Sequence, residues 1–126
     1  MHKLAWVLQI VFGAYFVASG VMHFVVPEGL PEPMAWMYEL PMWLHYASGT
    51  AEILGGLGLV LPGLTRIKTG LTPLAAGGLA AVMLLAAAWH LPRGETQSIA
   101  TNLVVAAVMA LLAYVRWRTH PLPARQ

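Results

Sequence analysis

Four long runs of apolar residues alternate with short polar or proline-rich segments along the chain. The runs cover about residues 4–26, 42–61, 71–91 and 99–115. Each run has close to the roughly 20 residues that an α-helix needs to cross a bilayer. The pattern therefore predicts an all-α, polytopic membrane protein, with four transmembrane helices packed as a bundle in a single domain of residues 1–126.

The segments between these runs carry signals that end helices. Residues 27–41, PEGLPEPMAWMYELP, are too rich in proline to continue a helix, so we expect an outer loop with one short turn. Its aromatic residues suit the headgroup layer, and a plain interfacial connector is favoured over a substrate gate. Pro62 with its following glycine predicts a stop for the second helix, and Ser98 is the predicted N-cap of the fourth. The basic tail, residues 116–126, is expected to fray.

Composition supports the membrane class and excludes several others. The chain is 59% hydrophobic and 10% charged, against about 25% charged residues in soluble domains. Its basic residues are scattered at segment ends and form no patch for nucleic acid. The sequence has no cysteine, which excludes disulfides, thiolate nucleophiles and cysteine-ligated metals. Any redox role would need a cofactor or substrate to carry the electrons.

The distribution of basic residues predicts the orientation. Placing the N-terminus inside makes six of them cytoplasmic and leaves only Arg93 outside, among four glutamates. The six are Lys3, Arg66, Lys68, Arg116, Arg118 and Arg125. By the positive-inside rule, both termini are therefore cytoplasmic. The chain is therefore predicted to be a multi-pass membrane protein, with the lipid bilayer as its first partner.

The candidate site lies on the second run, where His45 and Glu52 share a helix face because seven residues make almost two turns. Glu52 lies roughly 15 Å below the start of its helix, near the middle of the bilayer. An ionisable residue at that depth usually faces the protein interior or a functional path. The other polar residues of the outer half are His23, His90, Asn102 and Ser48. Together they outline a pocket that opens outward, whereas the inner half is predicted to hold almost no polar side chains.

Each candidate also has a plainer interpretation. A histidine at the end of a span is commonly an interfacial residue, which is the favoured interpretation for His23 or His90 taken alone. Glu52 could be a neutral carboxyl bonded to Asn102, Ser48 or a backbone carbonyl, holding helices together. Three histidines at one rim could hold a metal, but HExxH and HxxxH spacings are absent, so no metal is assigned. The glycines near Gly56 lie within a helix and predict close helix contact, not a dinucleotide site.

Two features resemble a known family. The first run ends in a histidine followed by proline, and the second reads AEILGGLGLVLPGLTR. With four spans in a chain of this length, they resemble the DoxX-like family of small bacterial membrane proteins. The resemblance implies a four-helix membrane bundle. It also implies a link to quinone-dependent sulfur oxidation or to membrane oxidoreductase complexes, with which some relatives are associated. The resemblance assigns no catalytic residue. Glu52 is identified only as the acidic position that matches the family's pattern.

Three functions follow as hypotheses. The favoured one is an accessory subunit of a membrane or periplasmic oxidoreductase that binds a quinone, hydrogen-bonded by Glu52 and His45. The second is a carrier or sensor of another hydrophobic small molecule. The third is a structural or assembly factor in which Glu52 only joins helices. A quinone is the one cofactor considered, an autonomous enzyme is the least supported class, and small-residue stripes would also suit a homo-oligomer.

Overall fold

The computed structural model describes residues 1–125, which form helices joined by loops and short turns. The elements in chain order are α1 (His2–Phe24), η1 (Glu32–Tyr38), α2 (Met42–Thr65), α3 (Leu71–His90), η2 (Leu91–Arg93), α4 (Thr96–Tyr114) and η3 (Val115–Thr119). Four stretches that contain α1 to α4 are long and apolar enough to cross a membrane. The predicted all-α class and the four candidate spans are thus confirmed.

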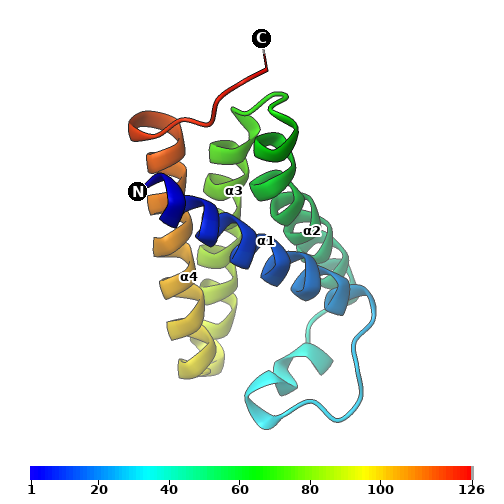
Figure 1. Cartoon of the computed structure of the whole chain (residues 1–126). Coiled ribbons are helices and arrows are strands. Elements are labelled where there is room, and N and C mark those ends of the chain that lie inside the picture. The colour runs from blue at the N-terminus through cyan, green and yellow to red at the C-terminus, as the bar shows by residue number, and fades with distance from the viewer. Residues whose placement is uncertain (126) are drawn as a thin grey trace.

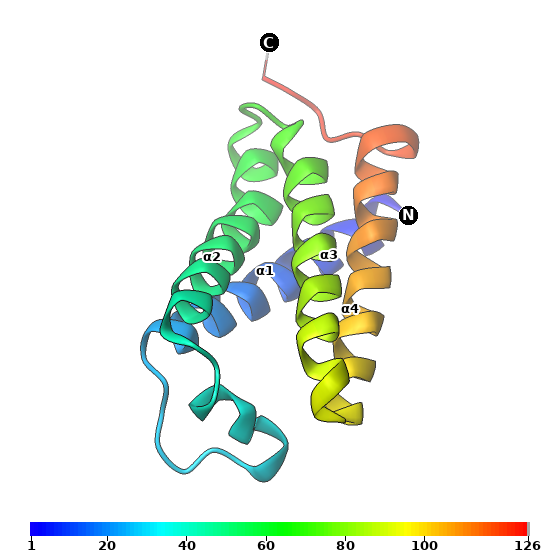
Figure 2. The same ribbon diagram turned by 180° about the vertical axis from the view of Figure 1, so that it is seen from behind.

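Helices α2, α3 and α4 stand side by side, and α1 lies obliquely across them (Figures 1 and 2). Helix α1 packs most extensively on α2, and α3 on α4. The two termini lie at one end of the molecule and the segment with η1 at the other. We call these the termini end and the η1 end. Large apolar side chains are exposed on all four helices, as expected of surfaces that face lipid; examples are Val7, Leu54, Leu74, Leu85 and Val104.

Glycines allow α1 and α2 to meet backbone to backbone. A Cβ atom added at Gly49 would lie 2.8 Å from the carbonyl oxygen of Gly20, and one added at Gly56 would lie 2.7 Å from that of Gly13. Side chains larger than hydrogen would force the two helices apart. The predicted role of the Gly56 region in close helix contact is confirmed. This contact also brings polar side chains beside it, on both helices, within hydrogen-bonding distance of one another.

Pro62 does not end α2, contrary to the prediction, because the helix continues to Thr65. Proline has no N–H, so the carbonyl of Gly58, four residues earlier, loses its helical partner. The hydroxyl of Thr72 on α3 donates to that carbonyl at 2.8 Å. The amide nitrogen of Gln9 on α1 donates to the next carbonyl, that of Leu59, at 2.7 Å. Thr72 therefore replaces the hydrogen bond that the proline removes, and Gln9 adds one to the neighbouring carbonyl, so the helix runs on past Pro62.

The termini end is more polar and more ordered than the sequence predicted. Arg116 is 2% exposed, and its Nε donates to Gln9 Oε1 at 2.6 Å. One of its terminal nitrogens also donates to His2 Nδ1, at 3.0 Å. The expectation that this half holds almost no polar side chains was wrong, because Gln9 and Arg116 are each buried by satisfying the other.

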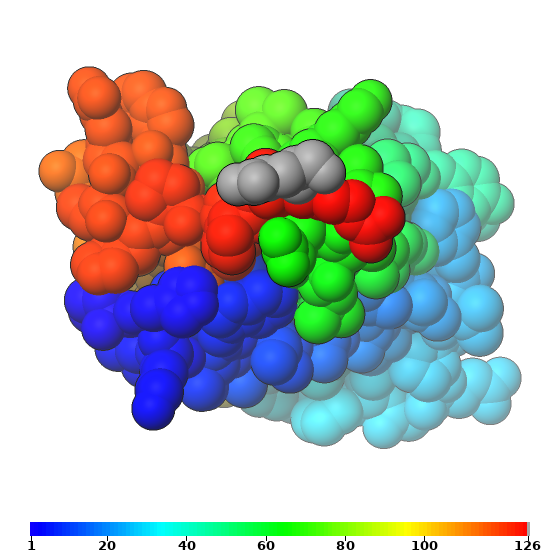
Figure 3. All heavy atoms as spheres, turned by 45° about the horizontal axis from the view of Figure 1, so that its top comes forward, coloured from blue at the N-terminus to red at the C-terminus, as the bar shows by residue number. Residues whose placement is uncertain are grey.

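The tail is likewise structured and not frayed through Arg125, and residue 126 lies outside the described residues. The helix of the fourth span runs on through η3 to Thr119. Beyond it, Leu122 is buried and the backbone N–H of Arg125 donates to the carbonyl of Arg66 at 2.6 Å. Figure 3 shows this terminal segment, in red, lying over the loop that joins α2 and α3. Apolar burial and one backbone hydrogen bond therefore fix a segment whose composition suggested disorder.

Two other helix ends differ from the prediction. Helix α1 ends at Phe24 and not at residue 26. Helix α4 begins at Thr96, with Glu95 at its N-cap position, so Ser98 lies inside the helix. Gly94, with φ of 68°, ends η2 in a left-handed conformation that glycine adopts at little cost, and α4 starts immediately after this turn.

The compensation of Pro62 can be tested with Thr72→Val, which keeps the shape of the side chain but removes its hydroxyl. We expect the free energy of unfolding in detergent to fall by about 1 kcal/mol, because the Gly58 carbonyl would be left unpaired among apolar side chains. In a Pro62→Ala background the helix can supply its own N–H to that carbonyl, so Thr72→Val should cost close to nothing. Thr101→Val is the matched control, since Thr101 binds only a carbonyl of its own helix. Equal losses in both backgrounds would contradict the assignment.

Candidate functional site

A continuous hydrogen-bonded series, which we call the Glu52 chain, runs between α1 and α2 toward the η1 end. The hydroxyl of Ser19 donates to Glu52 Oε1 at 2.7 Å, and Glu52 Oε2 lies 3.0 Å from His23 Nε2. The Nδ1 atoms of His23 and His45 lie 2.9 Å apart. His45 Nε2 then donates to the backbone carbonyl of Met37 at 2.8 Å. Four side chains and one carbonyl are linked in a single series.

Helical periodicity explains how these side chains come together. Ser19 and His23 are four residues apart on α1 and therefore share a face, as do His45 and Glu52, seven apart on α2. The two faces are opposed because the glycine contact between Gly20 and Gly49 lies between them. The site thus depends on backbone proximity that only glycine permits.

The Glu52 chain is buried, yet its polar atoms are paired. Glu52, His45 and His23 are only 3%, 5% and 6% exposed. Both oxygens of the Glu52 carboxyl have a partner, one on Ser19 and one on His23. Burial of an ionisable group away from water is costly unless its hydrogen bonds are replaced within the protein. For the carboxyl, residues of α1 meet that requirement, whereas His45 also needs the Met37 carbonyl of η1.

Element η1 covers the outer end of the Glu52 chain. Met37 is buried and supplies the carbonyl that accepts from His45 Nε2. The ring of Trp36 lies 6.2 Å from that of His23 and 4.8 Å from that of His90, centre to centre. Trp89 packs on both Trp36 and His90. The connector of residues 27–41 is therefore more than an interfacial loop, because one of its residues completes the polar series.

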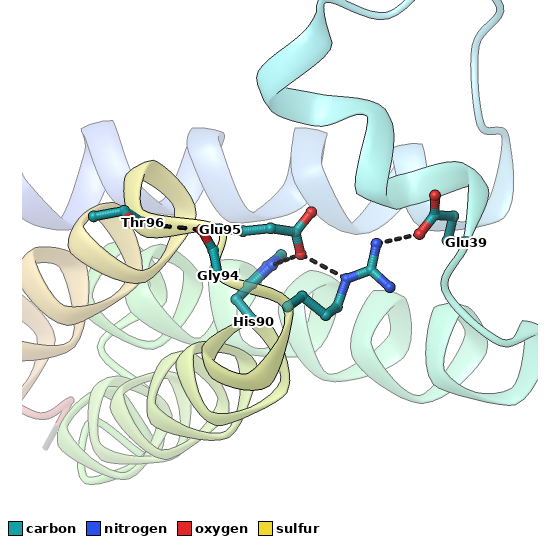
Figure 4. A network of polar contacts seen from close by, with 6 residues as sticks. Glu39, His90, Gly94, Glu95 and Thr96 are labelled. Carbon is teal, nitrogen blue, oxygen red and sulfur yellow. Dashed lines mark hydrogen bonds and ion pairs between the residues drawn. The ribbon is translucent and has the colours of Figure 1, made fainter.

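A second polar network ties η1 to the beginning of α4 (Figure 4). His90 Nδ1 donates to Glu95 Oε1 at 2.9 Å, and Arg93 Nε donates to the same oxygen at 2.7 Å. Arg93 also pairs with Glu39, the residue that follows η1. The hydrogen bond from Arg93, and then that from His90, lower the pKa of the Glu95 carboxyl below its ordinary range. We call Glu39, Arg93, Glu95 and His90 the tether.

The structure brings together some of the residues proposed from sequence and not others. Glu52, His45 and His23 lie in the Glu52 chain, while His90 belongs to the tether and reaches the chain only through Trp36. Within residues 1–125, neither Ser48 nor Asn102 makes a side-chain hydrogen bond to Glu52. The carboxyl is bound by His23 and by Ser19, and Ser19 was not among the predicted site residues although it lies one turn before His23.

Metal-ligand clusters and apolar grooves are the other features that could mark a binding site. Over the part of the chain that the structure describes, no three histidine or acidic side chains are grouped so as to hold a metal. One open apolar groove of about 370 Å³ runs between α2 and α3, and another of about 590 Å³ between α3 and α4. Neither groove is lined by a residue of the Glu52 chain, although Ala51 and Leu54 line the first. That groove follows the same stretch of α2 on its other side.

These features define an all-α protein with four helices able to span a membrane and a buried acid–imidazole series between the first two. Residues 7–112 of the chain match the DoxX-like family. Because this match covers most of the sequence, the protein belongs to the DoxX-like family, and the predicted resemblance is confirmed. No match was found among curated proteins or among solved structures.

The tether should weaken in acid. The pKa of Glu95 is lower in the folded protein than its ordinary value of 4.5, so the tether is at full strength above 4.5. It is lost as the pH falls through the lower folded-state value. We expect protease cleavage within residues 27–41 to rise over that interval at constant helix content. Glu95→Gln should show faster cleavage at neutral pH and no acid step. An identical acid step in Glu95→Gln would assign the transition to another group.

Proposed function

We propose that this DoxX-like protein is an accessory subunit of a bacterial membrane oxidoreductase system, and that it binds a quinone or a similar hydrophobic molecule at the Glu52 chain. The observation that carries the proposal is the buried chain itself. An acid and two imidazoles, aligned in one hydrogen-bonded series at an end of a membrane protein, are costly to maintain and suited to exchanging protons. The family association with quinone chemistry supports the same function.

The proposed placement is the inner membrane, with both termini in the cytoplasm and the η1 end facing the periplasm. Arg66 and Lys68 lie in the loop between α2 and α3, at the termini end with Lys3 and Arg116. Arg93 is at the other end, paired with glutamates. This charge distribution agrees with the positive-inside rule. A membrane or periplasmic oxidoreductase would then meet the η1 end, and a homo-oligomer could form through the apolar helix faces.

The residues at the η1 end fit a quinone head group chemically. His45 Nε2 offers an N–H to a carbonyl oxygen, and the rings of Trp36, Trp89 and His90 provide an aromatic environment. Since the chain has no cysteine, the electrons would be carried by the quinone and the partner. The contribution of this protein would be to bind the head group and to hold or supply a proton at the Glu52 chain.

A structural or assembly factor is the second candidate, and a specific observation favours it. Ser19 and His23 on α1 both bind Glu52 on α2, so the carboxyl joins these two helices directly. In this case the polar chain would serve helix association alone, with hydrogen bonds worth about 1 kcal/mol each or less. Glu52→Gln would keep those hydrogen bonds and so should leave folding and assembly intact.

Mass spectrometry of lipids that copurify in mild detergent distinguishes the two candidates. We expect the wild type to carry a quinone enriched over bulk membrane lipid. Glu52→Gln should retain about fivefold less, because an amide cannot give up a proton to the series and so weakens the hydrogen bond that the series makes to the head group. Glu32→Gln, in the first turn of η1 and outside the Glu52 chain, is the matched control and should behave as wild type. Background levels of quinone in all three folded proteins would reject the ligand function and leave the structural one.

A further inference from the structure

The number of protons in the Glu52 chain follows from its geometry. Three contacts, between Glu52 and His23, between His23 and His45, and between His45 and the Met37 carbonyl, are 3.0, 2.9 and 2.8 Å long. Each joins two atoms that both act as acceptors unless one of them is protonated, so each contact must contain one proton. A protonated carboxyl carries one proton and each neutral imidazole carries one, so three protons in all, shared by the Glu52 carboxyl and the two imidazole rings, give zero net charge wherever each proton lies along its contact.

The protons can therefore shift in concert without changing the total charge. A proton on Glu52 Oε2 can move to His23 Nε2 while the proton on His23 Nδ1 moves to His45 Nδ1. His23 is the shuttle, because both of its ring nitrogens lie within the series. His45 Nε2 is the only ring nitrogen of the series whose partner is not a side chain. Protons enter or leave the series most directly at that atom.

The partner of His45 Nε2 has the chemistry of a ligand. Met37 presents a carbonyl oxygen to it, and the neighbouring Trp36 places a planar ring between His23 and His90. A quinone head group also combines a planar ring with a carbonyl oxygen. Element η1 is held to the helices by the Arg93–Glu39 pair at the surface, and also by the buried Met37 and the rings around Trp36. The ion pair is weak, and a planar apolar ring in the place of Trp36 would restore the aromatic contacts that displacement of η1 removes.

We propose that η1 occupies the place of the ligand. In this inference, which rests on the proposed function, a quinone-like ring displaces Trp36 and its oxygen replaces the Met37 carbonyl at His45 Nε2. His45 is the residue that touches the ligand, and Glu52 is a positioning residue and proton reserve that acts through His23. The proton transfer accompanies an electron that the oxidoreductase partner of the proposed function supplies to the ring, because a neutral quinone oxygen is too weak a base to take a proton from imidazole. As the reduced ligand's oxygen accepts the His45 Nε2 proton, the His23 Nδ1 proton passes to His45 Nδ1 and the Glu52 proton passes to His23 Nε2. One O–H bond forms on the ligand, one breaks on Glu52, and Glu52 is left as a carboxylate.

Hydrogen exchange at the ring nitrogens of His23 tests the path without any ligand. The measurement is nuclear magnetic resonance of the full chain with isotopically labelled histidine nitrogens, in lipid nanodiscs. We expect His45→Gln to slow exchange at His23 by about tenfold or more, because an amide can still bind the Met37 carbonyl but cannot relay a proton. Glu39→Gln should accelerate exchange by about threefold by releasing η1, and Glu32→Gln, the control in η1, should not. Exchange that is unchanged in His45→Gln would overturn the path, and exchange unchanged in Glu39→Gln would overturn the role of η1.

A short-chain benzoquinone serves as the probe for the ligand position. We expect its addition to shift the His45 Nε2 resonance and to expose Trp36, with tighter binding in Glu39→Gln than in wild type or Glu32→Gln. A shift at Glu52 or His23 without one at His45 would overturn the proposal that His45 makes the contact. The two proposals can fail separately. Quinone at background level in the copurified lipid would contradict the proposed function. Unchanged hydrogen exchange at His23 in ligand-free His45→Gln would contradict only the inference drawn from the proton series.

Discussion

The structure depends on one constraint: polar groups within helices that face lipid must find their partners inside the protein. Two networks meet this constraint at opposite ends of the molecule. At the termini end, Thr72 and Gln9 bind carbonyls near Pro62, and Gln9 in turn binds the buried Arg116. Toward the η1 end, Glu52 is bound by Ser19 and His23. Each network joins residues of different helices. The polar groups can therefore pair only when the helices pack correctly, and the pairs in turn hold the helices together.

The two networks differ in what they can do. Arg116 keeps its proton under all ordinary conditions, and its buried acceptor, the side-chain amide of Gln9, has no proton to exchange, so the buried contact at the termini end cannot relay protons. The Glu52 chain contains a carboxyl and two imidazoles, whose protons can be redistributed along the same hydrogen bonds. A purely structural link between α1 and α2 would need only the serine and the acid. The two histidines extend the series to η1, which is why we place function there.

The sequence was sufficient for the fold class because span length and apolar composition are local properties. It was also sufficient to single out Glu52 with His45, since periodicity alone puts them on one face. The sequence could not predict a hydrogen bond whose second partner lies on another helix. Pro62 was predicted to stop α2, but Thr72 replaces the hydrogen bond that proline removes, and Gln9 binds the next carbonyl. Ser19 could have been noted from its spacing to His23, whereas the Met37 carbonyl depends on how η1 folds back and has no sequence signature.

The complete pairing of polar atoms within the Glu52 chain also limits how any ligand could bind. Both carboxyl oxygens and all four imidazole nitrogens of the chain already have partners. A ligand that bound Glu52 directly would have to separate α1 from α2 across the glycine contact, where the backbones are too close for even a methyl group. A ligand that replaced η1 would disturb a short helix held by a surface ion pair, by the buried Met37 and by the packing of Trp36, and would leave the contact between α1 and α2 intact. The cost of access is thus lowest at His45, and the same packing that buries Glu52 makes it reachable only through the two histidines.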